Sequence, residues 1–461
     1  MYIKQFFTEY DDSLTQTLNI DPLGMTMIWS ALGQRIFKNR VSSISNDVRN
    51  YTVNLLHHHV IKSFIETDAT TSKEIANAYP TLDCLAFKQA CLLHLENLFV
   101  FSMLSSESDD IDTIGVLGAA KGRNALNADR TTLKFTHNKQ SNLLVRQLTL
   151  GVSGRYKTPF IEMRFFDKEY RYHHPEYQKS WSKTECLIES THEFQALVVL
   201  LVVHLKDIVQ RQETIPMIDW GEVPAALKSA YVNCFLTPVA VGKKTRDFWL
   251  SVTELDEGAA GCLYQIIREN NDLDVLPYNL FHTAKDAIND PLERQKVVHI
   301  CSVEPLLAEF DLLFKLLLSE RTQDHAALYD AYRELGRTVN TLTSLANSLA
   351  VKSDIFDVLQ GIAHQRYRKL LAITDHNYPE TEEGFAALID FVLEYHRNIM
   401  SLRGQSPWVQ TFGDNAYRCN IKLATKPEKS KRPINSWNNR YYADEFTNLI
   451  RGLEGKRTEA Q

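Results

Sequence analysis

Hydrophobic residues recur at helical spacing through most of this chain. Ser45-Asn46-Asp47 is a cluster of residue types that cap helix N-termini, and apolar residues follow it at Val48, Tyr51, Leu55 and Leu56. Thr70-Thr71-Ser72, with Glu74 close behind, predicts another helix start. Phe87–Leu104 is predicted to form a strongly apolar helix. A further helix is predicted after Asp21-Pro22, with one apolar face formed by Met25, Ile28, Trp29, Leu32, Ile36 and Phe37.

The same spacing returns in the C-terminal half. After Glu304-Pro305, leucines and phenylalanines line one helix face as far as Leu317. Three further stretches continue the pattern: 324–352, 353–373 and 381–400. The last begins with two glutamates, which favour the N-terminal end of the helix dipole. We expect these helices to form a bundle, and a short amphipathic helix, Ala443–Leu453, to close the fold.

One segment departs from the helical pattern. Phe160–Phe165 alternates roughly between apolar and polar residues, as a short strand would, and it follows a turn predicted at Gly151–Gly154. A helix, a turn and a short strand pair would suit a small module of winged-helix-like form near residues 145–185. The predicted fold class is therefore mainly α and multi-helical, with this one small α+β part.

Changes in composition divide the chain into six predicted segments. The polar, acidic stretch Ser105–Asp112 is the best linker candidate in the N-terminal half. The segments are an N-terminal helical domain (1–105), an acidic linker (106–116), a basic module with some β structure (117–185), a central helical region (186–300), a helical bundle (301–402) and a basic C-terminal segment with a closing helix (403–461).

Composition also narrows the class of protein. The 18 glycines and 14 prolines are about 7% of the 461 residues, against a usual ~12%, which favours long helices over tight turns. Seven scattered cysteines without a CxxC pair fit reduced thiols better than a disulfide scaffold. No apolar run approaches the ~20 residues that cross a bilayer, and the first eleven residues lack the apolar core of a signal peptide. We therefore expect a cytoplasmic protein that contacts no membrane.

The most unusual feature of the sequence is a basic stretch, Leu117–Lys183. It holds thirteen Lys or Arg against five Asp or Glu, a net charge of +8 in a chain whose total is −6. Nine aromatic residues are interleaved with these charges. Exposed cations neutralise phosphates and aromatic rings stack on bases, so the stretch predicts nucleic-acid binding. Two alternatives stay open: the aromatics form a local core under a solvated charged face, or the cations dock on acidic protein surface, this chain's own or a partner's.

A second basic segment, Arg418–Arg440, holds seven Lys or Arg against one glutamate. It is a possible counterpart of the first, and the nucleic-acid interpretation depends on whether the two lie on one face. The candidate nucleic-acid-binding residues are Lys121, Arg123, Arg130, Lys134, Lys139, Arg155, Lys157, Lys429, Lys431 and Arg432.

Signatures of nucleotide and metal chemistry are missing. GxxxxGK[ST], GxGxxG, HExxH and GxSxG do not occur in the sequence. One catalytic alternative is open, because Arg294 and His299 resemble the HEPN ribonuclease motif in their separation and helical context. That resemblance implies a histidine acting as general acid or base and an arginine holding phosphate charge. The residue after Arg294 is Gln295, where the motif usually has Asn, Asp or His.

The histidines do not predict a metal site. His57-His58-His59 are consecutive, so on a helix their side chains point in different directions and at most two could share a metal ion. A partly exposed helix edge is the simpler interpretation. His204, inside an apolar run, is expected to be a core histidine bonded to a backbone carbonyl. We expect no cofactor, no metal and no catalytic residue.

These features together favour a non-catalytic helical subunit or adaptor of a multi-protein bacterial assembly that handles nucleic acid, with antiphage defence systems among the candidates. Because the chain lacks nucleotide and metal motifs, it would rely on partner subunits, such as an ATPase or a nuclease, for energy and cleavage. DNA and RNA are both open as ligands. The alternatives are a HEPN-like ribonuclease using Arg294 and His299, and a protein–protein scaffold without nucleic-acid contact.

Overall fold

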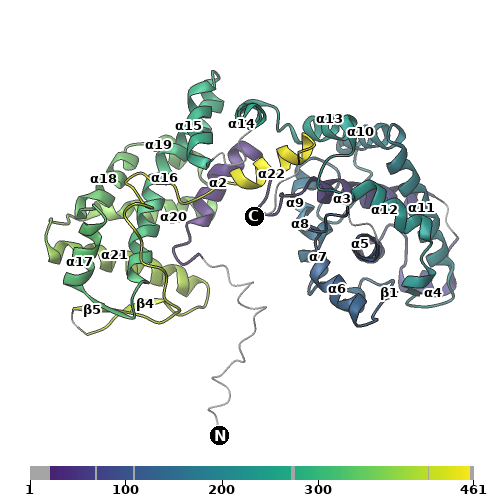
Figure 1. Ribbon diagram of the computed structural model, residues 1–461, viewed down its shortest axis with the longest axis horizontal. Coiled ribbons are helices and arrows are strands. Elements are labelled where there is room, and N and C mark those ends of the chain that lie inside the picture. Colours follow the sequence, from purple (N-terminus) through teal and green to yellow (C-terminus); the bar gives the residue numbers. More distant parts are fainter. Residues whose placement is uncertain (1–20, 68–69, 107–109, 271–275, 414, 457–461) are drawn as a thin grey trace, which may run out of the picture. The chain divides into compact units, whose positions relative to one another are not determined.

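The computed structural model describes residues 21–67, 70–106, 110–270, 276–413 and 415–456. These residues are mainly helical with two small antiparallel sheets, which confirms the predicted mainly α fold with a small α+β part (Figure 1). The chain divides into two compact units: unit 1 contains the described residues of 1–33 and 295–441, and unit 2 those of 34–294 and 442–461. The six finer segments of the sequence analysis stay a prediction.

Unit 2 is built around α3 (Val48–Glu66) and α5 (Leu85–Ser105), on which α11 (His192–Gln210) and α12 (Ala225–Phe235) pack. Figure 1 looks almost along α5, with the other three helices around it. The remaining helices of this unit are α4 (Lys73–Ala78), α6 (Ala119–Asn127), α7 (Gln147–Leu150), α8 (Val152–Arg155), α9 (Lys157–Glu162), α10 (Gln178–Glu189), α13 (Gly242–Thr253), α14 (Gly258–Glu269), α15 (Pro277–Ala287) and α22 (Ala443–Leu453).

Short 3-10 turns and one strand pair complete unit 2. The turns are η1 (Lys139–Ser141), η2 (Pro175–Tyr177) and η3 (Trp220–Glu222), and the strands are β1 (Thr132–Lys134) and β2 (Met217–Asp219). The strands pair antiparallel, with Leu133 opposite Ile218 in the core.

Several helix starts lie where the sequence places them. The Asp47 carboxylate accepts a hydrogen bond from the Arg49 backbone N–H at the start of α3, and the Ser72 hydroxyl accepts one from Ile75 at the start of α4. The predicted strongly apolar helix is α5, and nearly all its residues from Phe87 to Met103 are buried. The predicted closing helix coincides with α22. Apolar patterning and capping residues therefore position the helical core of unit 2.

The predicted strand at Phe160–Phe165 is wrong, and residues 145–185 contain helices and turns instead of a winged-helix-like module. The Arg164 backbone, two residues after the end of α9, adopts a left-handed φ of 59°. Its N–H donates to the carbonyl of Ile161, and the Phe165 N–H donates to that of Phe160. This pair of bonds is the Schellman motif of a helix C-terminus. The alternation therefore comes from apolar residues packed around a helix end, and the β structure of unit 2 lies at β1 and β2.

Unit 1 is built around α16 (Pro291–Leu317) and α21 (Glu382–Leu402), and its N-terminal helix is α2 (Thr26–Phe37). A boundary between the units falls within α2 and another within α16, which runs through Pro305 without interruption. The other helical elements are α17 (His325–Glu334), α18 (Val339–Ala350), α19 (Ser353–Val358), α20 (Gly361–Leu371) and η4 (Ala372–Asp375). Strands β3 (Thr322–Asp324), β5 (Ala416–Cys419) and β4 (Val409–Thr411) form an antiparallel sheet in that order.

Two buried carboxylates of α16, Glu304 and Glu309, find partners elsewhere in unit 1. The Glu304 carboxylate accepts hydrogen bonds from the backbone of Asn438 and Asn439 and from the Tyr441 hydroxyl. Glu309, five residues after Glu304 on α16, pairs with Arg337 at 2.7 Å, and both side chains are 1% exposed. These contacts satisfy charges that would be costly to bury alone.

Candidate functional site

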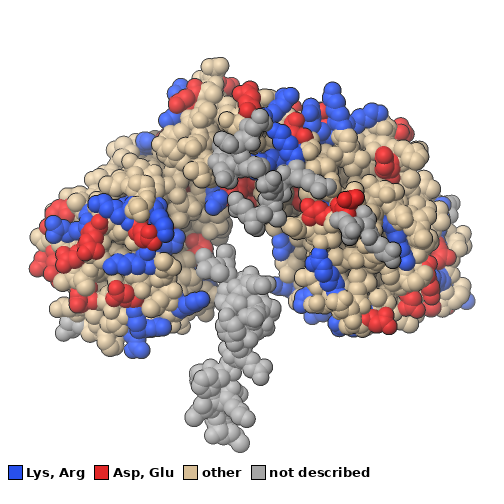
Figure 2. Space-filling view, in the orientation of Figure 1, with Lys and Arg blue, Asp and Glu red and all other residues tan. Residues whose placement is uncertain are grey.

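Seven of the ten predicted nucleic-acid-binding residues lie in unit 2. Lys121 and Arg123 are exposed on α6, and Arg130 follows that helix. Lys134, Lys139, Arg155 and Lys157 lie in β1, η1, α8 and α9 respectively. Figure 2 shows Lys and Arg side chains on the edge of unit 2 that carries α6, and again on the edge that carries α10 and α13.

The charge of Leu117–Lys183 is not neutralised within the described part of the chain. Ten of its thirteen Lys and Arg are exposed, and the other three, Lys134, Lys157 and Lys183, are half-buried. Only Arg171 forms an ion pair with a residue that the structure describes, at 2.5 Å from Asp167. Two predicted site residues have other contacts: Arg123 donates to the Thr113 hydroxyl, and Lys157 donates to the carbonyl of Lys168. Burial also lowers the pKa of Lys157, which lies over the Tyr170 ring.

The aromatic residues of the same stretch are not available to a ligand. Eight of the nine are buried, and the ninth, Tyr177, is half-buried. Phe160 packs against Phe165, Phe166 and Trp249, while the indole N–H of Trp181 donates to the carbonyl of Phe165. This confirms the alternative in which the aromatics form a local core. Any contact with nucleic acid here would rest on charge and not on base stacking.

The three C-terminal candidates lie in unit 1, and two of them have carboxylate partners. Arg432 is 14% exposed, donates to Asp311 at 2.9 Å and donates to the carbonyl of Ala308. Lys431 forms an exposed ion pair with Glu428 at 2.8 Å. Lys429 is exposed and its stem lies beside Gly336. The two basic stretches therefore belong to different compact units, and Arg432 is held by α16.

Arg294 and His299 lie on α16, but their side chains are not both accessible. Arg294 is exposed, whereas His299 is 1% exposed and bonds the Asp354 carboxylate at 2.7 Å. Gln295 also donates to Asp354, and the hydrogen bond from His299 is the main reason why the pKa of Asp354 is lowered. Five helical positions place two side chains about 140° apart around the axis. The arrangement fits a structural histidine that ties α16 to the start of α19.

His57, His58 and His59 are buried, which contradicts the predicted partly exposed helix edge. His57 and His58 bond the hydroxyls of Tyr231 and Tyr172. The edge interpretation failed because α3 is covered on all sides. Among the residues that the structure describes, no group of three or more His, Cys, Asp or Glu side chains could hold a metal ion. His204 is a core residue as predicted, but its ring is hydrogen-bonded to His94 rather than to a carbonyl.

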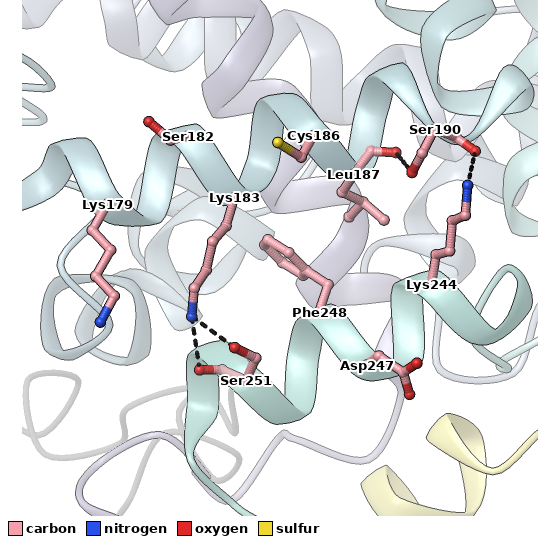
Figure 3. A pocket seen from close by; sticks show the side chains of 10 residues that line it. All are labelled: Lys179, Ser182, Lys183, Cys186, Leu187, Ser190, Lys244, Asp247, Phe248 and Ser251. Atoms are coloured by element: carbon pink, nitrogen blue, oxygen red, sulfur yellow. Dashed lines mark hydrogen bonds between the residues drawn. The ribbon is translucent and has the colours of Figure 1, made fainter.

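Sequence reasoning missed an open groove between α10 and α13, with a volume of about 580 Å³ (Figure 3). The helices run in opposite directions, because Lys183 contacts Ser251 while Lys244 contacts the carbonyl of Ser190. The α10 side is lined by Lys179, Ser182, Lys183, Cys186, Leu187 and Ser190. The α13 side is lined by Lys244, Asp247, Phe248 and Ser251. The lining residues of each helix are three, four or seven positions apart, so they share one helix face, and this spacing was the signal that the sequence offered.

The groove has an apolar floor and a cationic lining. Phe248 points between the two helices in Figure 3 and is 8% exposed, and Leu187 beside it is also buried. Lys183 donates to the Ser251 hydroxyl at 2.6 Å, and Lys244 donates to the Ser190 carbonyl at 3.2 Å. Both acceptors are uncharged, so no carboxylate neutralises either lysine in these contacts.

A second hollow of about 320 Å³ continues past the same lysines, and its charges largely balance. Arg40 and Lys38 both pair with Glu254 at 2.8 Å, and these hydrogen bonds lower the pKa of that carboxyl to about 2. Arg164, from the Schellman turn, also lines this hollow. The excess of positive charge therefore lies in the first groove.

No protein-family model matches this chain, and no curated protein or solved structure matches it either. Among the described helices, none is by itself long and apolar enough to cross a membrane. One pair of consecutive helical segments, Pro175–Glu189 and His192–Gln210, is long and apolar enough by length and composition only when the two are taken together, and the chain bends by 106° between them.

Proposed function

We propose that this chain is a non-catalytic subunit of a nucleic-acid-handling assembly, in which unit 2 contacts the phosphate backbone. The observation that carries the proposal is the set of twelve Lys and Arg within Leu117–Lys183 that have no ion-pair partner among the described residues. Unpaired exposed cations release counterions when they meet phosphates, and this release drives binding. Because the aromatic side chains are buried, the proposed contact is with the phosphate backbone and not with the bases, so binding would tolerate different nucleotide sequences.

The wider proposal follows from what the chain lacks in sequence. Without a nucleotide-binding or metal-binding motif, it would act beside partner subunits that supply ATP hydrolysis or cleavage. A cytoplasmic accessory role in a bacterial assembly, such as an antiphage defence system, fits that division of labour.

The test is a comparison of two charge-reversed variants of the full chain. Lys121→Glu/Arg123→Glu/Arg130→Glu changes three exposed cations of the basic stretch. Lys73→Glu/Lys206→Glu/Lys243→Glu changes three exposed lysines elsewhere in unit 2 by the same total charge. We expect the first variant to lose at least about tenfold in affinity for duplex or single-stranded nucleic acid, and the second to lose less. Equal losses would show that only net charge matters, and absent binding would favour the protein scaffold.

A further inference from the structure

We propose that the groove between α10 and α13 binds an acidic amphipathic helix of a partner protein. The lining face of α10 runs from Lys179 to Ser190, about 16 Å at 1.5 Å per residue, which is the length of three helical turns. Two helices side by side leave a trough into which a third helix can lay its apolar face. The groove is open along its length, which suits a helix better than an enclosed small molecule.

The charge of the lining selects the sign of the occupant. Three lysines line the groove against one acid, Asp247. Lys183 and Lys244 donate to serine oxygens and meet no carboxylate among the described residues. Lys179 forms no ion pair within the described chain and points freely in Figure 3. Glutamates flanking the apolar side chains of a partner helix would meet these ammonium groups, and a basic helix would be repelled.

The floor of the groove favours a protein side chain over a nucleotide base. Phe248 offers only a small part of its ring, because it is 8% exposed and lies between the helices. A base needs an open aromatic face to stack on. Leucine or methionine anchors need only apolar contact, which Phe248, Leu187 and the thiol of Cys186 provide. Lys179 and Lys183 of this site belong to the basic stretch Leu117–Lys183, but the site does not include Lys121, Arg123 or Arg130. The proposal does not rest on nucleic-acid binding.

The probe for this site is a labelled synthetic helix of about four turns, with leucines along one face and glutamates elsewhere. Its control replaces each glutamate with lysine. Fluorescence anisotropy with the full-length protein should show binding of the acidic peptide at least about tenfold tighter than that of the basic one. The acidic peptide should also slow alkylation of Cys186, which lines the groove. All seven cysteines lie in the described part of the chain, and Cys186 is the exposed one.

Two variants keep the result specific to the groove. Lys179→Glu should weaken the acidic peptide by about tenfold, because it reverses a lining charge that has no structural partner. Lys168→Glu, an exposed lysine of the same basic stretch outside the groove, should leave affinity within about twofold. Absent binding, equal binding of both peptides, or equal effects of the two variants would overturn the proposal. So would displacement of the peptide by an oligonucleotide whose binding also depends on Lys179.

Discussion

His94 and His204 stack in the core of unit 2, with their Nε2 atoms 3.0 Å apart and their ring planes 16° from parallel. One nitrogen must donate and the other accept, so at least one ring is neutral. Burial lowers the pKa of His94 well below its usual value and that of His204 to about 4. Burial likewise lowers the pKa of His57 to about 3, of His59 to about 4, and of His58 strongly. Unit 2 therefore folds around five histidines kept neutral.

Unit 2 should lose stability as the pH falls below about 6.5. The unfolded chain then binds protons on these histidines that the folded core rejects, so the free energy of unfolding falls by on the order of 1 kcal/mol per pH unit for each. The slope ends near the folded pKa values of about 3 to 4. Glu96 acts in the opposite direction, because burial raises its pKa. Urea unfolding at pH 7 and pH 5 measures the difference, and equal stability at both values would contradict the neutral core.

The Arg337–Glu309 pair should be costly to break. Arg337→Met leaves the Glu309 carboxylate buried without its partner and should lower the free energy of unfolding by about 3–5 kcal/mol. Adding Glu309→Leu should restore much of the loss, because neither charge is then buried. Lys431→Met breaks an exposed pair and serves as the control, with an effect below about 1 kcal/mol. Chemical denaturation of the wild type, Arg337→Met, Arg337→Met/Glu309→Leu and Lys431→Met measures these free energies. An Arg337→Met variant as stable as the wild type would show that the pair is not buried.

Arg164→Gly should stabilise the protein by about 0.5–1 kcal/mol. At the left-handed position of a Schellman motif, glycine avoids the Cβ crowding that arginine suffers. In the strand predicted from sequence, the same change would destabilise, since glycine weakens strand interiors. A higher melting temperature of Arg164→Gly therefore supports the helix end, and a lower one would support the strand.

His299→Ala should leave any RNA cleavage by purified protein unchanged. The histidine is buried against Asp354 and cannot meet a substrate phosphate without an opening of α16 and α19. The variant should instead be less stable, because a buried side chain and its hydrogen bond are removed. Loss of cleavage in a variant that keeps its circular dichroism spectrum would support the HEPN-like alternative.

The helices were predictable where local signals agree with the packing. Asp47 and Ser72 cap the helices that they precede, and the residues from Ala443 to Leu453 form a helix whose apolar stripe is buried. Phe160–Phe165 misled because buried residues around a helix end alternate by chance as a strand does. A left-handed arginine gives no sequence signal, whereas a glycine there would have marked the helix end.

The candidate site was predictable in charge and not in shape. The excess of Lys and Arg is visible in sequence, but the pairing of Arg432 with Asp311 depends on residues 121 positions apart. The same is true of the groove, because Lys183 and Ser251 meet only once α10 and α13 pack. The burial of His57–His59 required knowing that α3 is covered on every side, which its mixed composition conceals.

The salt dependence of nucleic-acid binding tests the central claim most directly. The affinity of the full chain for a duplex of about 30 base pairs should fall linearly on a log–log plot between about 50 and 200 mM salt. Lys121→Glu/Arg123→Glu/Arg130→Glu should make that slope shallower by about 2 to 3, and Lys73→Glu/Lys206→Glu/Lys243→Glu should change it less. An affinity that does not depend on salt, or no binding at the lowest salt, would contradict the account.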